Sequence, residues 1–278
     1  MVTTGFSGAS IRHGTVNGWS NSGIVANDLA RISDIYLHNN AGAAIFAGNL
    51  CTIEDCTAYS NGLGIQAQDL AVIRHCAVTA TDGEAISVGA SARVEHCVAK
   101  SAGLDGIRVT THGTVLDCTA DSNGGAGIHA TGDSSVQDCS ASANTGAGFD
   151  VGDGVAVARC RAFSNAGPGI SCGGSCLIED NHCRANGDGA ATAAGIQVAT
   201  NATRTVIRGN NCVSNDWGIK VDGPANLVFG NRCSLNPTNY SIIANNRVAI
   251  ILALPLSPAI SGNSGGSAVS DPDANYAY

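Results

Sequence analysis

One short pattern repeats along residues 45–170 with a period of about 21 residues. Each repeat reads Gly-Ile-x-Val, then a polar turn, then Val-x-x-Cys-x-Ala, and then Ser-Asn-x-Gly. The apolar anchor of the first segment recurs at Ile45, Ile65, Ile86, Ile107, Ile128, Phe149 and Ile170. Self-similarity at this period is typical of a solenoid in which each repeat forms one coil.

Two solenoid architectures have repeats of about this length, the leucine-rich repeat and the β-helix. Leucine is sparse at the repeated apolar positions, which hold Ile, Val, Ala and Cys instead. Apolar and polar residues alternate over short segments, as in Ile107-Arg108-Val109, and a period of two indicates strands. The sequence therefore predicts an all-β fold, a single-stranded right-handed parallel β-helix of about eleven coils with three short strands per coil.

Equivalent residues of stacked coils lie about 4.8 Å apart and form ladders. The spacing places nine of the twelve cysteines at one repeat position, which predicts a cysteine ladder: Cys56, Cys76, Cys97, Cys118, Cys139, Cys160, Cys183, Cys212 and Cys233. We expect these thiols to be buried and reduced, because side chains in a ladder run parallel rather than toward each other.

An asparagine ladder is predicted at the turn after the third strand of each coil: Asn40, Asn61, Asn123, Asn144, Asn165, Asn186, Asn215 and Asn236. Asparagine tolerates the left-handed backbone conformation, so we expect it to adopt that conformation here. Its amide can also bond to the coils on either side. Thr81 and Ala102 interrupt the ladder, and we expect a reshaped turn there.

The predicted β-helix covers residues 1–254, with regular repeats over 45–170, looser repeats over 171–247 and an apolar carboxy-terminal lid over 248–254. We expect Ile243 to continue the isoleucine ladder. Residues 255–278 read as a linker rich in Pro, Gly and Ser followed by a tail with Tyr276 and Tyr278. This tail is expected to dock on the solenoid or on a second copy.

Composition bears on the partners of the chain. The net charge is −8 with only two lysines, which argues against nucleic acid and anionic membranes because both need clustered basic residues. No segment approaches the roughly 20 apolar residues of a membrane span. The first coil lacks the polar cap of a solenoid, so self-association through this edge and the tail is expected. We also expect a trimmed chain, because no signal peptide precedes the repeats.

With these repeats and the tail Asp-Pro-Asp-Ala-Asn-Tyr-Ala-Tyr, the chain resembles right-handed β-helix proteins of the pectin-lyase-like superfamily. In particular, it is similar to uncharacterised bacterial proteins whose tail ends in a comparable aromatic-polar motif. Members of that family usually carry an export signal, so the resemblance implies a secreted or cell-envelope protein. It also implies that enzymes on this fold are mostly polysaccharide lyases and hydrolases that work in a groove along an outer sheet. The repeats themselves specify a fold and not an activity.

A lyase needs a base and a group that neutralises a uronate carboxylate, often Ca²⁺. The outward position between Ile and Val is the most polar one, and successive repeats place Arg108, His129 and Asp150 there. We expect these three side chains to lie on successive rungs within reach of one another, as cation, base and orienting carboxylate. The alternative is a surface ladder whose charges alternate to avoid repulsion.

A hydrolase needs paired carboxylates, and the column before the cysteine supplies Asp117 and Asp138. The alternative is that these residues lie at corners, where their side chains cap turn N–H groups. A cluster of Cys172, Cys176, His182 and Cys183 resembles a zinc site. Since their register puts them in separate ladders, no metal or cofactor site is predicted, and Ca²⁺ would enter only with a lyase.

Three functions remain open from the sequence. The first is a non-catalytic extracellular or envelope scaffold, which could be oligomeric. The second is a polysaccharide lyase or, with less support, a hydrolase. The third is a carbohydrate-binding or adhesin-like module. The motifs of galacturonan hydrolases (Asn-Thr-Asp, Asp-Asp, Gly-His-Gly and Arg-Ile-Lys) do not occur in the chain, which favours the scaffold.

Overall fold

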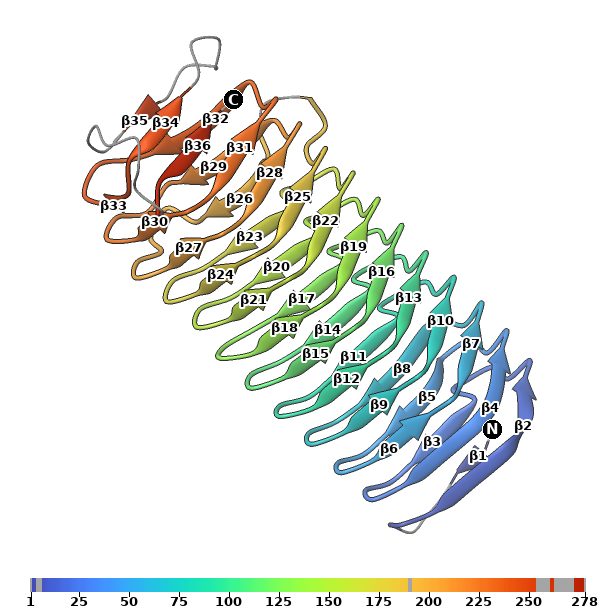
Figure 1. The fold of residues 1–278 in the computed structure, drawn as a ribbon. Helices are drawn as coiled ribbons and strands as arrows, with labels where there is room; N and C mark the ends of the chain where they lie inside the picture. Colours follow the sequence, from blue (N-terminus) through green and yellow to red (C-terminus); the bar gives the residue numbers. More distant parts are fainter. Residues whose placement is uncertain (1, 4–6, 190–191, 254–260, 263–272, 278) are drawn as a thin grey trace. The chain divides into compact units, whose positions relative to one another are not determined.

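The computed structural model describes residues 2–3, 7–189, 192–253, 261–262 and 273–277. The regular elements of these residues are all β-strands, and neighbouring strands pair in parallel (Figure 1). Most coils contribute three strands, and the architecture is a right-handed parallel β-helix, which confirms the predicted fold class. The chain divides into two compact units, residues 1–135 and 136–278.

In the first unit, the isoleucine anchors lie in one parallel sheet, which we call the anchor sheet. Its strands are β1 (Val2–Thr3), β3 (Ile24–Ala26), β5 (Ala43–Ala47), β8 (Leu63–Ala67), β11 (Ile86–Val88), β14 (Ile107–Val109) and β17 (Ile128–Ala130). Two further ladders complete the coils, and the long strands β2 (Ser10–Asn17) and β4 (Arg31–His38) span both of them. The second ladder continues with β6 (Thr52–Glu54), β9 (Val72–Arg74), β12 (Arg93–Glu95) and β15 (Thr114–Leu116). The third continues with β7 (Thr57–Tyr59), β10 (Ala77–Thr79), β13 (Val98–Lys100) and β16 (Thr119–Asp121).

The second unit repeats this arrangement. Its anchor sheet contains β20 (Phe149–Val151), β23 (Ile170–Cys172), β26 (Ala194–Val198), β29 (Trp217–Val221), β32 (Thr238–Ile242) and β35 (Ser261–Gly262). The second ladder contains β18 (Ser135–Gln137), which begins at the last residue of the first unit, and β21 (Ala156–Ala158), β24 (Leu177–Glu179), β27 (Val206–Arg208), β30 (Leu227–Phe229) and β33 (Arg247–Val248). The third contains β19 (Ser140–Ser142), β22 (Arg161–Phe163), β25 (His182–Arg184), β28 (Asn211–Val213), β31 (Arg232–Ser234), β36 (Asn275–Ala277) and β34 (Ile251–Ala253).

Side chains alternate between core and surface along the short strands. On β14, Ile107 and Val109 are buried and Arg108 faces outward, as the period of two predicts. The core is narrow because its columns hold Ile, Val, Ala and Cys, and all twelve cysteines are buried as thiols.

The cysteine ladder differs from its prediction in the second unit. Cys183 aligns with Ala162 rather than with Cys160, whose backbone N–H instead bonds to the side chain of Asn181. The nine cysteines therefore occupy two columns, because later coils place Asn where earlier coils have Cys, and Cys where they have Ala. Cys183, Cys212 and Cys233 form the second column.

Left-handed backbone geometry marks the corners of the coils. The φ angles of Leu50, Asp55 and Ser60 are 57°, 54° and 51°. These residues follow the successive strands β5, β6 and β7. The prediction that the asparagine adopts the left-handed conformation is wrong by one position, because Ser60 rather than Asn61 has the positive φ. The left-handed residue makes the bend and stays at the surface, which turns the following asparagine into the core.

The asparagine ladder itself is confirmed. The side-chain amide of Asn165 donates to Asn186 Oδ1 at 2.8 Å, and Asn186 donates in turn to Asn215 Oδ1 at 2.9 Å. At the predicted interruption, Thr81 turns its hydroxyl to the carbonyl oxygen of Gly83 at 3.0 Å. These buried amides satisfy the backbone groups that a tight corner leaves unpaired.

The tail returns to the solenoid. Strand β36 pairs with β31 and β34, and Asn275 accepts a hydrogen bond from the amide of Asn231 at 3.1 Å. Tyr240 is fully buried at an isoleucine-anchor position, and its hydroxyl lies 2.9 Å from Asn231 O and 3.0 Å from Tyr276 O. The prediction for Ile243 is therefore wrong, since Tyr240 takes the anchor position and Ile243 is exposed. Tyr278 and Leu254 lie outside the described residues.

Candidate functional site

The outer face of the anchor sheet in the first unit carries one continuous column of side chains. Parallel register aligns them on successive rungs as Phe46, Gln66, Ser87, Arg108 and His129. Phe46 is 40% exposed and borders a hollow of about 310 Å³ that Asp28 and Gln68 also line. The column therefore has an aromatic ring toward one end and two basic side chains at the other.

Arg108 and His129 converge on a carboxylate. His129 Nδ1 lies 3.4 Å from Asp105 Oδ2, and Arg108 Nη1 lies 3.8 Å from the same oxygen. The other oxygen, Oδ1, accepts the backbone N–H of Ala126 at 2.8 Å. The Asp105 side chain is only 16% exposed, against 43% for Arg108, so a half-buried anion sits beneath a more exposed cation. We call these three residues the Asp105 cluster.

The electrostatics of the cluster favour an ionised Asp105. Burial raises the pKa of this carboxyl, but the His129 ring, the N–H of Ala126 and the charge of Arg108 outweigh burial. The pKa of Asp105 is therefore lowered from its usual value. The carboxylate can hold His129 through Nδ1 and so fix the orientation of the ring.

The three residues of the predicted trio lie on strands β14, β17 and β20. Arg108 and His129 lie on neighbouring strands β14 and β17, as predicted. Asp150 lies on β20 in the second unit, where its partner in register is Ser171. The carboxylate that contacts Arg108 and His129 within the first unit is Asp105, which sequence reasoning missed. A usable signal is the acid at the same position of the preceding coil, Glu84, two residues before its anchor.

The column before the cysteines consists of left-handed corner residues. Asp117 and Asp138 have φ angles of 51° and 54°. Asp117 lies 3.0 Å from His96 Nδ1, and Asp138 holds the guanidinium of Arg159 at 2.8 Å. The bond from Arg159 lowers the pKa of Asp138. Each candidate hydrolase acid is thus paired with a basic side chain from a neighbouring coil, and both carboxylates are exposed.

Two histidines of the same column stack. The rings of His75 and His96 have centroids 5.1 Å apart and planes within 7° of each other. Within the described ranges, no group of three or more His, Cys, Asp or Glu side chains is arranged to hold a metal ion. Cys172 and Cys176 are both buried, and the contact with Cys176 together with burial holds the pKa of Cys172 well above its usual value.

The described residues contain no helix that is long and apolar enough to cross a membrane.

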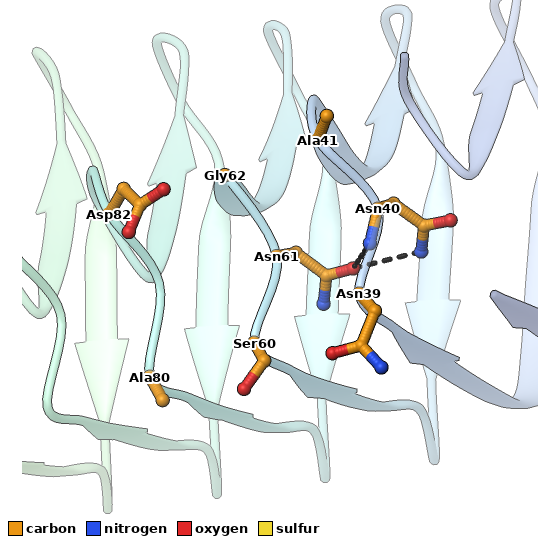
Figure 2. A pocket seen from close by; sticks show the side chains of 8 residues that line it. All are labelled: Asn39, Asn40, Ala41, Ser60, Asn61, Gly62, Ala80 and Asp82. Carbon is orange, nitrogen blue, oxygen red and sulfur yellow. Dashed lines mark hydrogen bonds between the residues drawn. The ribbon is translucent and has the colours of Figure 1, made fainter. Parts of the chain in front are cut away.

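Another hollow, of about 360 Å³, opens at the turns of the first unit. Figure 2 shows that Asn61 lies in it with its oxygen directed at Asn40. This oxygen accepts the backbone N–H of Asn40 at 3.0 Å and its side-chain amide at 2.8 Å. The side chains of Asn40 and Asn61 in this hollow are thus used by the asparagine ladder, and they belong to the architecture of the corner.

Comparison with protein families defines the class of the chain. The model of the right-handed β-helix region matches residues 2–136 and 105–236, so the chain belongs to this family. A search of curated proteins finds no match.

Solved structures resemble the chain at low identity. The A-module of the mannuronan C-5 epimerase AlgE4 of Azotobacter vinelandii has a TM-score of 0.69 at 14% identity, covering 95% of this chain and 88% of its own. A double mutant of the periplasmic alginate epimerase AlgG has a TM-score of 0.60 at 11% identity, covering 96% and 73%. The Dettilon tailspike protein reaches 0.54 at 15% identity, covering 96% and 61%. At these identities the likeness shows a shared fold alone.

Proposed function

We propose that this protein is a non-catalytic, secreted or cell-envelope β-helix scaffold that binds polysaccharide on the outer face of the anchor sheet in its first unit. The observation that carries the proposal is the Asp105 cluster, which ends an outward column that begins near the exposed ring of Phe46. An open face with one ring and a few convergent polar groups suits an extended, hydroxyl-rich polymer.

The side chains of the column match the chemistry of sugars. The Phe46 ring can pack against the apolar face of a sugar ring, beside the polar groups of Asp28 and Gln68 in the adjoining hollow. Arg108 can donate two parallel hydrogen bonds to neighbouring hydroxyls or to a carboxylate. Two of the similar structures are a mannuronan C-5 epimerase and an alginate epimerase, and this supports a polysaccharide as the ligand.

The contacts of Asp105 favour binding over catalysis. Both of its oxygens are already engaged, one by the N–H of Ala126 and the other by His129 and Arg108. This mutual neutralisation positions the two basic side chains for a ligand without requiring turnover.

A second candidate function is proton abstraction from a uronate, as in a lyase. Arg108 would neutralise the uronate carboxylate, and His129, oriented by Asp105, would accept the proton. The approach of His129 Nδ1 to Asp105 at 3.4 Å is the observation that favours this candidate.

The experiment is a panel of acidic and neutral polysaccharides, tested for binding by affinity electrophoresis and for turnover by ultraviolet absorbance and reducing ends. The panel is run with Ca²⁺ and with a chelator. Arg108→Gln should weaken binding, whereas the exposed Arg31→Gln in the same unit should not. Binding without new absorbance supports the scaffold. New absorbance that His129→Gln abolishes would establish the lyase, and no retention by any polysaccharide would overturn the proposal.

A further inference from the structure

A second outer surface, in the second unit, has an unusual distribution of charge. Strands β19, β22, β25, β28 and β31 lie side by side (Figure 1). Eight of their first and third residues are exposed or half-buried, and all eight are neutral or basic: Ser140, Arg161, Phe163, His182, Arg184, Asn211, Val213 and Arg232. In a chain of net charge −8, this surface concentrates positive charge, and we call it the cationic strip.

The basic side chains of the cationic strip face solvent without acidic partners. Within the part of the chain that the structure describes, none of the four basic side chains forms an ion pair. Other arginines of this unit hold carboxylates, as Arg208 does with Glu179. Arg161 lies directly opposite His182 on the neighbouring strand, so two basic side chains stand together. An anionic ligand would supply the counter-charge for the guanidinium.

A hollow lies in the middle of the strip. It measures about 280 Å³ and is lined by Ser140, Arg161, Phe163, His182 and Arg184. The Phe163 ring is 47% exposed and stands beside Arg184 on the neighbouring rung. The volume is slightly below the roughly 300 Å³ at which small-molecule sites start, so the hollow has room for no more than one sugar ring beside the aromatic face.

We propose that the cationic strip binds an acidic polysaccharide, with one sugar against Phe163 and its anionic group held by Arg161 and Arg184. Guanidinium groups recognise carboxylates and sulfates through paired hydrogen bonds. Along the same column, Asn211, Arg232 and the half-buried Tyr276 continue the path on successive rungs, so a polymer can run across the coils. The proposal rests on the proposed polysaccharide-binding function, and adds the charge of the ligand and a second site.

Nucleic acid is the less favoured occupant. Its affinity comes from many phosphate contacts with Lys and Arg and from repeated stacking on aromatic rings. The strip offers three arginines and one outward phenylalanine on the five strands, within an acidic chain. Serine and asparagine between the cations instead suit sugar hydroxyls.

The test measures binding of the full chain to polygalacturonate, dextran sulfate, neutral dextran and single-stranded DNA by calorimetry at low salt. The variant is Arg161→Gln with Arg184→Gln. Its matched control is Arg12→Gln with Arg31→Gln, which changes the net charge equally at exposed positions of the first unit. Thermal unfolding checks that both variants fold.

We expect salt-sensitive binding of polygalacturonate or dextran sulfate that falls at least about tenfold in the variant, because each guanidinium makes charged hydrogen bonds. The two anionic polymers decide between carboxylate and sulfate. The control should bind as the wild type does, and Phe163→Ala should weaken binding as well. If acidic polymers bind the variant undiminished while Arg108→Gln abolishes binding, the strip is not the site and the proposed function stands. If no polysaccharide binds, both proposals fail, and a preference for DNA would overturn the choice of partner.

Discussion

Asn165 offers the sharpest test of how the corners are stabilised. Its side chain is buried and makes four hydrogen bonds inside the second unit. Oδ1 accepts the backbone N–H and the amide of Asn144 at 3.1 and 2.9 Å. Nδ2 donates to Ala141 O at 3.1 Å and to Asn186 Oδ1 at 2.8 Å. Replacing Asn165 by alanine removes all four and leaves buried partners unsatisfied.

The magnitude follows from these bonds. Each contributes about 1 kcal/mol net, and a buried group left without a partner costs about 1–3 kcal/mol, so Asn165→Ala should lower the free energy of unfolding by roughly 4 kcal/mol. Urea denaturation followed by circular dichroism measures this change. The matched control is the adjacent exposed Ser164→Ala, because Ala143 and Ala185 already occupy that left-handed corner on the neighbouring coils. A loss below about 1 kcal/mol for Asn165→Ala, or an equal loss for Ser164→Ala, would refute the reasoning.

Four further outcomes are expected. Because the pKa of Asp105 is lowered by folding, its ionised form adds stability above the unfolded pKa of about 3.9, and this is lost as the pH falls through the folded pKa. Asp105→Asn should therefore lower the free energy of unfolding at pH 7, and near pH 2 the variant and the wild type should have the same free energy of unfolding, as measured by denaturation at the two pH values. Tyr240→Phe should cost about 1 kcal/mol, measured by urea denaturation, since it removes the hydroxyl that reaches Asn231 and Tyr276. The twelve buried thiols should react with a thiol reagent only after unfolding, whereas rapid reaction of the native chain would contradict their burial. Self-association remains a prediction, and light scattering that gives a monomer would contradict it.

Much of the fold could be predicted, because the repeat period directly indicates one coil per repeat. The alternation in Ile107-Arg108-Val109 indicates which side chains enter the core, and the structure confirms this. The corners could not be predicted to the residue, since Ser60 and Asn61 both tolerate turns and only packing decides which side chain is buried. The shift of Cys183 into the alanine column has the same origin, because the extra residues between Cys160 and Cys183 hide the change of register.

Only part of the candidate site could be predicted from the sequence. Arg108 and His129 follow from the period of two, because both lie inside strands. Asp105 precedes strand β14, where that period does not apply, and so its direction toward the two basic side chains could not be predicted. The cationic strip could not be predicted, because its basic side chains come together only when the register aligns Arg161 with His182 on the neighbouring strand.

The most direct measurement of polysaccharide binding is calorimetric titration of the full chain with polygalacturonate and neutral dextran, beside the variants Arg108→Gln and Arg161→Gln/Arg184→Gln. We expect saturable binding of polysaccharide that both variants weaken and that the control Arg31→Gln retains. Undiminished binding in both variants would contradict the two assigned surfaces, and the absence of binding to every polysaccharide would contradict the proposed function itself.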